Sequence, residues 1–237
     1  MDASPQKIVS LITSASTRFI VPVFQRPYSW DEENLTQLWE DVLSVGKGLG
    51  APHFTGSVVW IQAGTMSPSG VTPVMLIDGQ QRITTITLLL IALARYAKAH
   101  SESELAFSFD EIIDLGYLVN KHKKGDDRYK LTLSQGDRDT LRSIIDNLQN
   151  PDVEIVQDSE KLLNNLAFLE THVNSFEDPN IIWAGIHRLE VVSVSLTMGQ
   201  DNPQLIFESM NSTGKDLSSA DLIRNFVLMG HPNQDEL

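Results

Sequence analysis

The chain has 237 residues, of which 41% are hydrophobic, and it contains no cysteine. Its 18 basic and 31 acidic residues give a formal net charge of −13. The lack of cysteine excludes disulfide scaffolds, thiolate metal sites and cysteine nucleophiles. The negative charge argues against a protein that coats DNA or an anionic membrane through bulk charge, although it leaves room for a local basic site.

The amino terminus does not have the pattern of a signal peptide, because an acid stands at position 2 and no basic region precedes an apolar stretch. The most apolar segment, residues 83–94, is well short of the roughly 20 residues that span a bilayer. We therefore expect a soluble, cytoplasmic protein with no membrane partner, and a buried helix over this segment.

Four runs rich in β-branched residues and bounded by turn signals predict strands over 19–23, 54–62, 72–78 and 189–197. Between them, Ser29 and Glu32 have the spacing of a capping box that opens a helix over 31–45. Pro203 is placed to begin a later helix that ends at Gly214. A last helix is expected over 220–229.

The middle of the chain is the acidic part. Residues 101–185 hold 17 acidic and 8 basic residues, a net charge of −9, and their apolar residues recur at helical spacing. The residues on either side of this segment, 1–100 and 186–237, are nearly balanced in charge. These features predict an α+β protein in which residues 1–100 and 186–237 form one core, interrupted by an acidic, mostly helical insertion over 101–185.

The first candidate site is the segment from Asp78 to Arg82, where an apolar strand turns at Gly79 into a helix. Free amide groups at a helix amino terminus bind anions, and glycine lets a ligand approach the backbone. Arg82 in the first turn opposes the helix dipole, a conflict that a bound phosphate would relieve. The alternative is that Asp78 caps the helix and Arg82 forms a surface ion pair.

A second candidate is the loop after the first predicted strand, where Gln25 and Arg26 precede Tyr28 and Trp30. A cation beside large aromatic rings suits a phosphate with a base or ribose on an aromatic face. The same rings would equally well pack the loop onto the following helix.

The third candidate is the polar turn between the last two predicted helices. Asn211 offers hydrogen bonds there, and Lys215 and Arg224 offer charge for a phosphate, unless the turn only separates two helices. The histidines lack the spacing of a zinc site, and the sequence gives no sign of a Ser–His–Asp triad.

Four segments in this order, VPVFQRPYSW, HFTGSVV, LIDGQQRITT and FESMNSTGKDLSSADLIRN, resemble the motifs of the GmrSD-type amino-terminal domain. The turn after residue 78 is also similar to the phosphate-binding turn of ParB and sulfiredoxin-like folds. The resemblance implies a ParB/sulfiredoxin-like small sheet with flanking helices, and binding and hydrolysis of GTP or another NTP. It further implies a part in modification-dependent, type IV restriction of phage DNA. It assigns the NTPase motif to Asp78, Gly79, Gln80, Gln81 and Arg82, the pocket lining also to Gln25 and Arg26, and DNA-modification contacts to Phe24 through Tyr28.

On this reading, Asp78 holds Mg²⁺ or acts as a base, and Gln80 or Gln81 orients the attacking water. Relatives continue into a His–Asn–His nuclease domain whose motif is absent from this sequence, so we expect a nuclease domain or partner protein outside it. The alternatives are a module that recognises modified DNA without catalysis of its own, and a purely structural or interaction domain.

Overall fold

The computed structural model describes residues 1–14, 17–48, 53–134, 136–197, 201 and 206, with the backbone alone described at Asp114. Six strands form one mixed sheet in the order β1-β6-β3-β4-β2-β5. The strands are β1 (Asp2–Lys7), β2 (Thr17–Ile20), β3 (Phe54–Gln62), β4 (Thr72–Asp78), β5 (Leu131–Thr132) and β6 (Glu190–Leu196). Pairing is antiparallel for β1–β6 and β3–β4 and parallel for the other neighbours.

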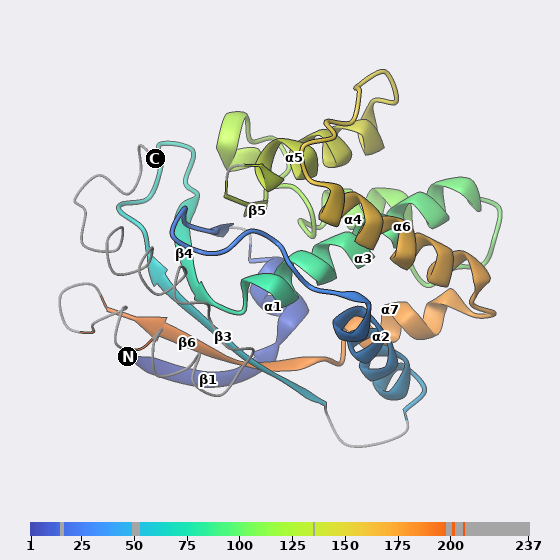
Figure 1. Cartoon of the computed structure of the whole chain (residues 1–237), viewed down its shortest axis with the longest axis horizontal. Helices are drawn as coiled ribbons and strands as arrows, with labels where there is room; N and C mark the ends of the chain where they lie inside the picture. The colour runs from blue at the N-terminus through green and yellow to red at the C-terminus, as the bar shows by residue number, and fades with distance from the viewer. Residues whose placement is uncertain (15–16, 49–52, 135, 198–200, 202–205, 207–237) are drawn as a thin grey trace.

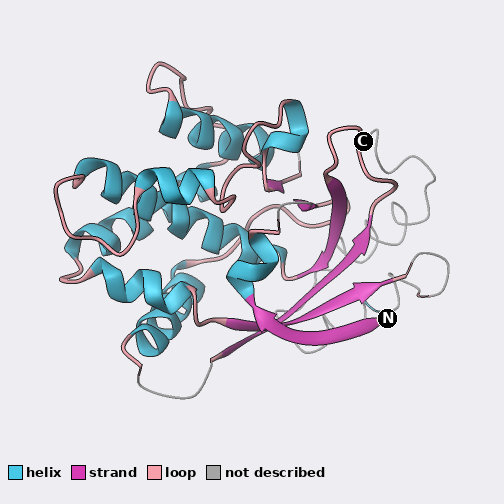
Figure 2. Cartoon of the chain, turned by 180° about the vertical axis from the view of Figure 1, so that it is seen from behind, coloured by secondary structure: helices cyan, strands magenta, loops and turns pink. Residues whose placement is uncertain are grey.

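The helices lie together on one side of the molecule and the strands on the other (Figures 1 and 2). They are α1 (Ile8–Ile12), α2 (Glu32–Gly46), α3 (Gln80–Ala99), α4 (Phe109–Asp114), α5 (Asp137–Gln149), α6 (Glu160–Ser175) and α7 (Pro179–Ile186), with a 3₁₀ turn η1 over Gly125–Arg128. The mixed sheet with flanking helices confirms the α+β class. The likeness to ParB and sulfiredoxin stays a prediction.

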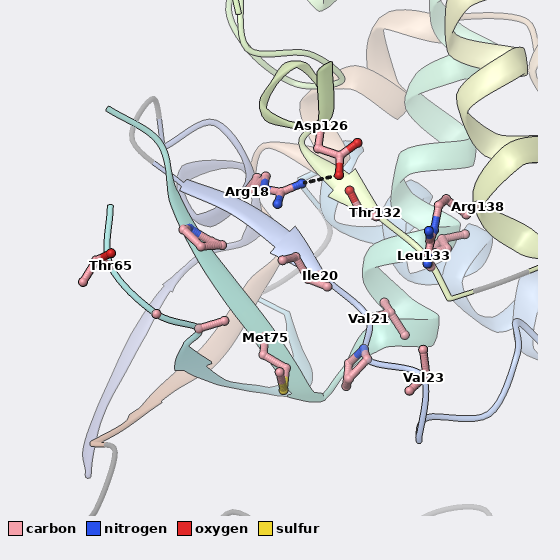
Figure 3. Close-up of a pocket in the computed structure, with 14 residues that line it drawn as sticks. Arg18, Ile20, Val21, Val23, Thr65, Met75, Asp126, Thr132, Leu133 and Arg138 are labelled. Carbon is pink, nitrogen blue, oxygen red and sulfur yellow. Dashed lines mark hydrogen bonds and ion pairs between the residues drawn. The ribbon is translucent and has the colours of Figure 1, made fainter. Parts of the chain in front are cut away.

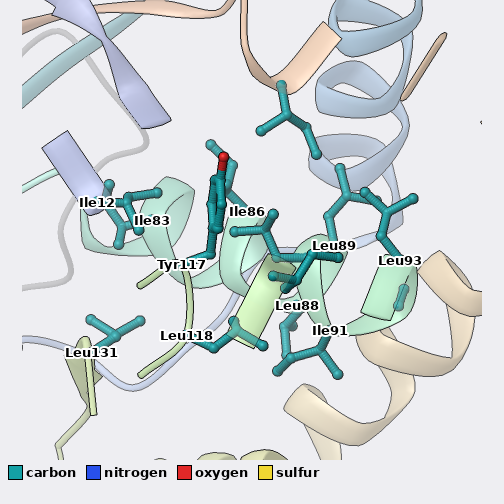
Figure 4. Packing of buried hydrophobic residues seen from close by; sticks show 14 of the residues in the cluster. Ile12, Ile83, Ile86, Leu88, Leu89, Ile91, Leu93, Tyr117, Leu118 and Leu131 are labelled. Carbon is teal, nitrogen blue, oxygen red and sulfur yellow. The ribbon is translucent and has the colours of Figure 1, made fainter. Parts of the chain in front are cut away.

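Helix α3 is the centre of the main core. Most of its side chains are buried on all faces, as expected for a helix that is hydrophobic around its whole circumference. Figure 4 shows Ile83, Ile86 and Leu89 of α3 among Ile12 of α1 and Leu131 of β5. Helix α6 packs along α3. The helix that carries the first candidate motif is therefore rigidly held.

Strand β4 separates two apolar clusters. Val74 and Leu76 belong to the main core, whereas Met75 and Ile77 belong to a smaller cluster with Phe24. This alternation follows from the period of two in a strand. Phe24, expected to contact DNA, is almost fully buried in this smaller cluster.

Several expected elements differ in their bounds. Strand β2 ends at Ile20 rather than at residue 23, because Pro22 has no N–H with which to continue the ladder. Helix α2 is capped by Asp31 with Asn34 in a reciprocal capping box, and not by Ser29 with Glu32. Strands β1 and β5 were not predicted from the sequence. The first is an exposed, mostly polar edge strand, and the second has only two residues.

The acidic segment, residues 101–185, packs against the flanking parts of the chain. It contributes β5 to the sheet, and α7 packs against α2 so closely that a Cβ at Gly185 would lie 2.1 Å from the carbonyl oxygen of Val42. The boundaries at residues 100 and 185 stay a prediction. Within the described ranges, none of the helices is both long and apolar enough to cross a membrane.

Candidate functional site

The turn between β4 and α3 is shaped by Gly79. Its φ of 88° lies in the left-handed region, and a Cβ there would lie 2.9 Å from the carbonyl oxygen of Ser57. Both features favour glycine. The turn therefore brings Asp78, at the carboxyl end of β4, directly before the free amide groups of the first turn of α3.

Arg82 folds back from this first turn onto β3. Its Nη1 donates to the carbonyl oxygen of Ser57 at 3.0 Å, and the Ser57 hydroxyl donates to Asp78 Oδ2 at 3.2 Å. Gly56 has a φ of 107°, and a Cβ there would lie 2.7 Å from Arg82 Nη2. The start of β3 thus forms a wall that contacts the guanidinium of Arg82.

Burial lowers the pKa of Arg82, and the negative charges of Asp78 and Asp41 oppose this effect. Asp41 comes from α2, and its Oδ1 lies 3.2 Å from His53 Nε2. Since burial disfavours the charged guanidinium, a further anion beside Arg82 would stabilise it. Neither carboxylate lies within ion-pair distance of Arg82 among the described contacts.

The two glutamines of the motif bind the loop that follows β2. Gln80 Nε2 donates to Gln25 Oε1 at 3.0 Å and to the carbonyl oxygen of Arg26 at 3.3 Å. Gln81 accepts from the backbone N–H of Ser29 at 2.8 Å and donates to the carbonyl oxygen of residue 27 at 3.2 Å. Both glutamines are buried. Their side chains fix the position of the 25–29 loop.

Tyr28 anchors the same loop in the core. Its hydroxyl lies 2.7 Å from Thr85 Oγ1 and accepts from Asn165 Nδ2 at 3.1 Å, and its backbone N–H donates to Asp137 Oδ2 at 2.7 Å. Burial raises the pKa of Tyr28, with a smaller contribution from Asp137 in the same direction. Two helices of the acidic segment, α5 and α6, thereby hold a loop of the flanking core.

Arg26 differs from its neighbours in the loop. Its side chain is partly exposed, and the described residues provide no hydrogen bond or ion pair for its guanidinium. Gln25, by contrast, is buried and donates to the carbonyl oxygen of Ile77 at 2.8 Å.

The structure therefore brings the first two sequence motifs together. Asn211, Lys215 and Arg224 of the third motif, and the helices expected there, lie outside the described residues.

The sequence predicted no role for Gly56, Ser57, Asp41 or His53. A glycine inside a strand pattern can indicate a close backbone approach, and the segment HFTGSVV contains such a glycine. No local signal connects Asp41 with His53, because they lie on separate elements. Within the described ranges, no group of three or more His, Asp or Glu side chains is placed to hold a metal ion.

The mixed sheet and the arginine-bearing turn after β4 define an α+β domain with one strand–turn–helix site held between β3 and the 25–29 loop. The model of the GmrSD restriction endonuclease N-terminal domain matches residues 7–228. The chain belongs to this family, which makes it a restriction or defence protein. No curated protein matches the chain significantly.

Proposed function

We propose that the turn from Asp78 to Arg82 binds the phosphates of an NTP, with GTP favoured, and that the domain hydrolyses it. The observation that carries the proposal is the position of Arg82. Its guanidinium is largely buried against the carbonyl oxygen of Ser57, which also lies close to Gly79 before the first-turn amide groups of α3, and burial opposes its charge. A phosphate oxyanion would accept from those amides and compensate the arginine.

Mg²⁺ fits this arrangement through Asp78. Mg²⁺ is commonly held by one or two carboxylates together with substrate phosphates. Asp78 Oδ2 accepts from Ser57, whereas Oδ1 has no protein partner among the described contacts. We assign Gln80 and Gln81 to positioning the 25–29 loop, since their amides are engaged there, and we assign Arg26 and the expected Lys215 to the phosphates. The bound ion would neutralise charge on the phosphates.

The test is the variant Arg82→Gln, with GTP binding measured by calorimetry and turnover by phosphate release. We expect affinity to fall by about tenfold or more, because a charge-assisted hydrogen bond to phosphate contributes about 1.5–3 kcal/mol. Lys98→Gln is the matched control. It removes one charge from the last turn of the same helix, where Lys98 Nζ donates to the carbonyl oxygen of Leu148 at 2.7 Å, so it also reports a general loosening of α3.

Wild-type affinity and turnover in Arg82→Gln, with an unchanged unfolding midpoint, would contradict the site. A loss shared equally by Lys98→Gln would point to general destabilisation of α3. Asp78→Asn keeps the shape of the side chain and removes its charge. We expect it to weaken Mg²⁺-dependent binding much more than binding measured in the presence of EDTA.

The second candidate function is recognition of modified DNA without catalysis by this domain, and it is favoured by the 25–29 loop. Among the described residues the partly exposed Arg26 guanidinium has no recorded partner, and the residues on either side of it are fixed by buried hydrogen bonds. A rigid, cationic projection suits contact with a DNA phosphate or base. Gel shifts of plain and modified duplexes, with and without GTP, separate the two functions, because DNA binding without nucleotide affinity supports the second alone.

A further inference from the structure

Ser57 contacts both charged groups of the turn after β4, each through a different oxygen atom. Its hydroxyl donates to Asp78 Oδ2 at 3.2 Å, and its carbonyl oxygen accepts from Arg82 Nη1 at 3.0 Å. The same carbonyl oxygen would lie 2.9 Å from a Cβ at Gly79. One residue of β3 therefore contacts the carboxylate, the glycine of the turn and the guanidinium.

Ser57 lies beside a bulge in β3. Phe54 pairs with Glu190 of β6, whereas Ser57 pairs with Val192, so β3 advances by three residues where β6 advances by two. Gly56, within this stretch, has a φ of 107°. A bulge bends its strand and changes the direction in which the groups around it point. The bulge therefore explains how groups at the start of β3 reach the first turn of α3.

A second bulge lies in the neighbouring strand, β4. The consecutive positions 59 and 60 of β3 pair with Asp78 and Leu76, so β4 has one extra residue, Ile77. The carbonyl oxygen of Ile77 accepts from the side chain of Gln25 at 2.8 Å. Both strands that carry the contact between Ser57 and Asp78 are thus bulged beside it, as is frequent next to functional sites.

Arg82 is held differently from Arg18, which lies beside a cavity of about 450 Å³. Figure 3 shows Arg18 with Asp126, whose Oδ2 lies 3.7 Å from its Nη1. Asp127 Oδ1 lies 3.3 Å from its Nε, so two carboxylates balance the charge of Arg18. The carbonyl oxygen of Ser57 instead fixes Arg82 without neutralising it. The charge of Arg82 is therefore left for a phosphate.

We propose that Ser57 is a positioning residue for the binding of Mg²⁺ and nucleotide, an inference that rests on the proposed function of this turn. Its hydroxyl orients Asp78, the group assigned to the metal ion, and its carbonyl oxygen orients Arg82, the group assigned to the phosphates. One residue thereby sets the spacing between the two groups. Loss of a hydrogen-bond partner of a metal-binding carboxylate commonly weakens metal affinity by about 10–100-fold.

The two contacts can be separated, because one uses the side chain and the other the backbone. Ser57→Ala removes the hydroxyl and keeps the carbonyl oxygen that holds Arg82. We expect the variant to need about tenfold more Mg²⁺ for half-maximal GTP binding, with GTP affinity in EDTA unchanged. In an Asp78→Asn background the same substitution should have no further effect on the metal dependence, because Ser57 acts through Asp78.

Calorimetric titration of the full chain with GTP, over a series of Mg²⁺ concentrations and in EDTA, measures both quantities. Electron paramagnetic resonance of Mn²⁺, used in place of Mg²⁺, counts the bound metal directly. Ser57→Thr keeps a hydroxyl and should retain the wild-type metal dependence. Thr55→Val is the matched control. It removes a hydroxyl of the same strand that donates to the carbonyl oxygen of Glu190 at 3.3 Å, outside the site.

An unchanged Mg²⁺ dependence in Ser57→Ala, where the wild type binds GTP, overturns the positioning role and leaves the proposed function standing. Equal losses with Mg²⁺ and in EDTA also overturn it, because they would show a general disturbance of the turn. A wild type that binds no GTP under either condition overturns the proposed function and the positioning role together. Loss of the Mg²⁺-dependent part alone, retained by Ser57→Thr and Thr55→Val, supports the positioning role.

Discussion

A substitution at Gly56 can test the contact between the start of β3 and the guanidinium of Arg82. In Gly56→Ala the new methyl group would lie 2.7 Å from Arg82 Nη2, in a backbone with φ of 107°. We expect a loss of about 1–3 kcal/mol in unfolding free energy and, because Arg82 is displaced, weaker GTP binding. The control is Gly64→Ala, whose φ is 80° and whose Cβ would have no neighbour within 4 Å. Denaturant unfolding and calorimetry of both variants separate backbone strain from the clash. Equal losses would argue against the clash.

The burial of Lys130 should make the free energy of unfolding depend on pH. Burial lowers its pKa to about 8, from an ordinary 10.5, and its Nζ donates to the carbonyl oxygen of Ser14 at 2.6 Å. Between these two pH values the unfolded chain binds the proton more tightly than the folded chain. The free energy of unfolding should therefore rise with pH across this window, by an amount on the order of 2 kcal/mol.

The measurement is denaturant unfolding of the wild type and Lys130→Met across that window. The wild-type curve should rise more steeply than that of the variant. The exposed Lys124→Met serves as the control and should keep the wild-type slope. Parallel curves for the wild type and Lys130→Met would show that Lys130 is not perturbed by folding.

The position of the 25–29 loop depends on a hydrogen bond from Asp137 at the start of α5. The buried carboxylate of Asp137 accepts from the backbone N–H of Tyr28 at 2.7 Å and from the hydroxyl of Ser159 at 2.6 Å. Asp137→Ala leaves both donors buried and unpaired, so we expect a loss of about 2–4 kcal/mol. Asp139→Ala, at an exposed position in the same turn, should change little. Limited proteolysis should show cleavage near the loop in the first variant alone. An intact loop in Asp137→Ala would contradict this anchoring.

The elements that the sequence predicted best are those with a strong local signal. The bounds of β3 and β4 agree with the expected strands, because their apolar runs are bounded by turn residues. Strand β1 has no such run, since it pairs only with β6 at the edge of the sheet and stays exposed. Asp78 and Arg82 could be recognised together because they share one turn. The contact between Asp41 and His53 depends on how α2 meets β3, which no local pattern encodes.

One continuous hydrophobic core contains residues from the acidic segment and from both flanks, so we expect them to unfold cooperatively. The main core contains Leu166 and Ile182 from the acidic segment together with Val42 and Leu89 from the flanks. Removal of the segment would expose much of α3, whose side chains are buried on all faces. A domain with one continuous core unfolds in a single transition. We therefore expect residues 101–185 and both flanks to unfold together.

Tryptophan fluorescence can test this, since Trp183 lies in α7 and Trp60 in β3. Two variants are compared, each keeping one of these tryptophans and replacing the other three with phenylalanine. In each variant the denaturation midpoint by fluorescence should equal the midpoint by far-UV circular dichroism, because both probes report the same transition. An earlier midpoint for Trp183 alone would show that the acidic segment unfolds separately. It would then behave as an insertion attached to a core that is stable without it.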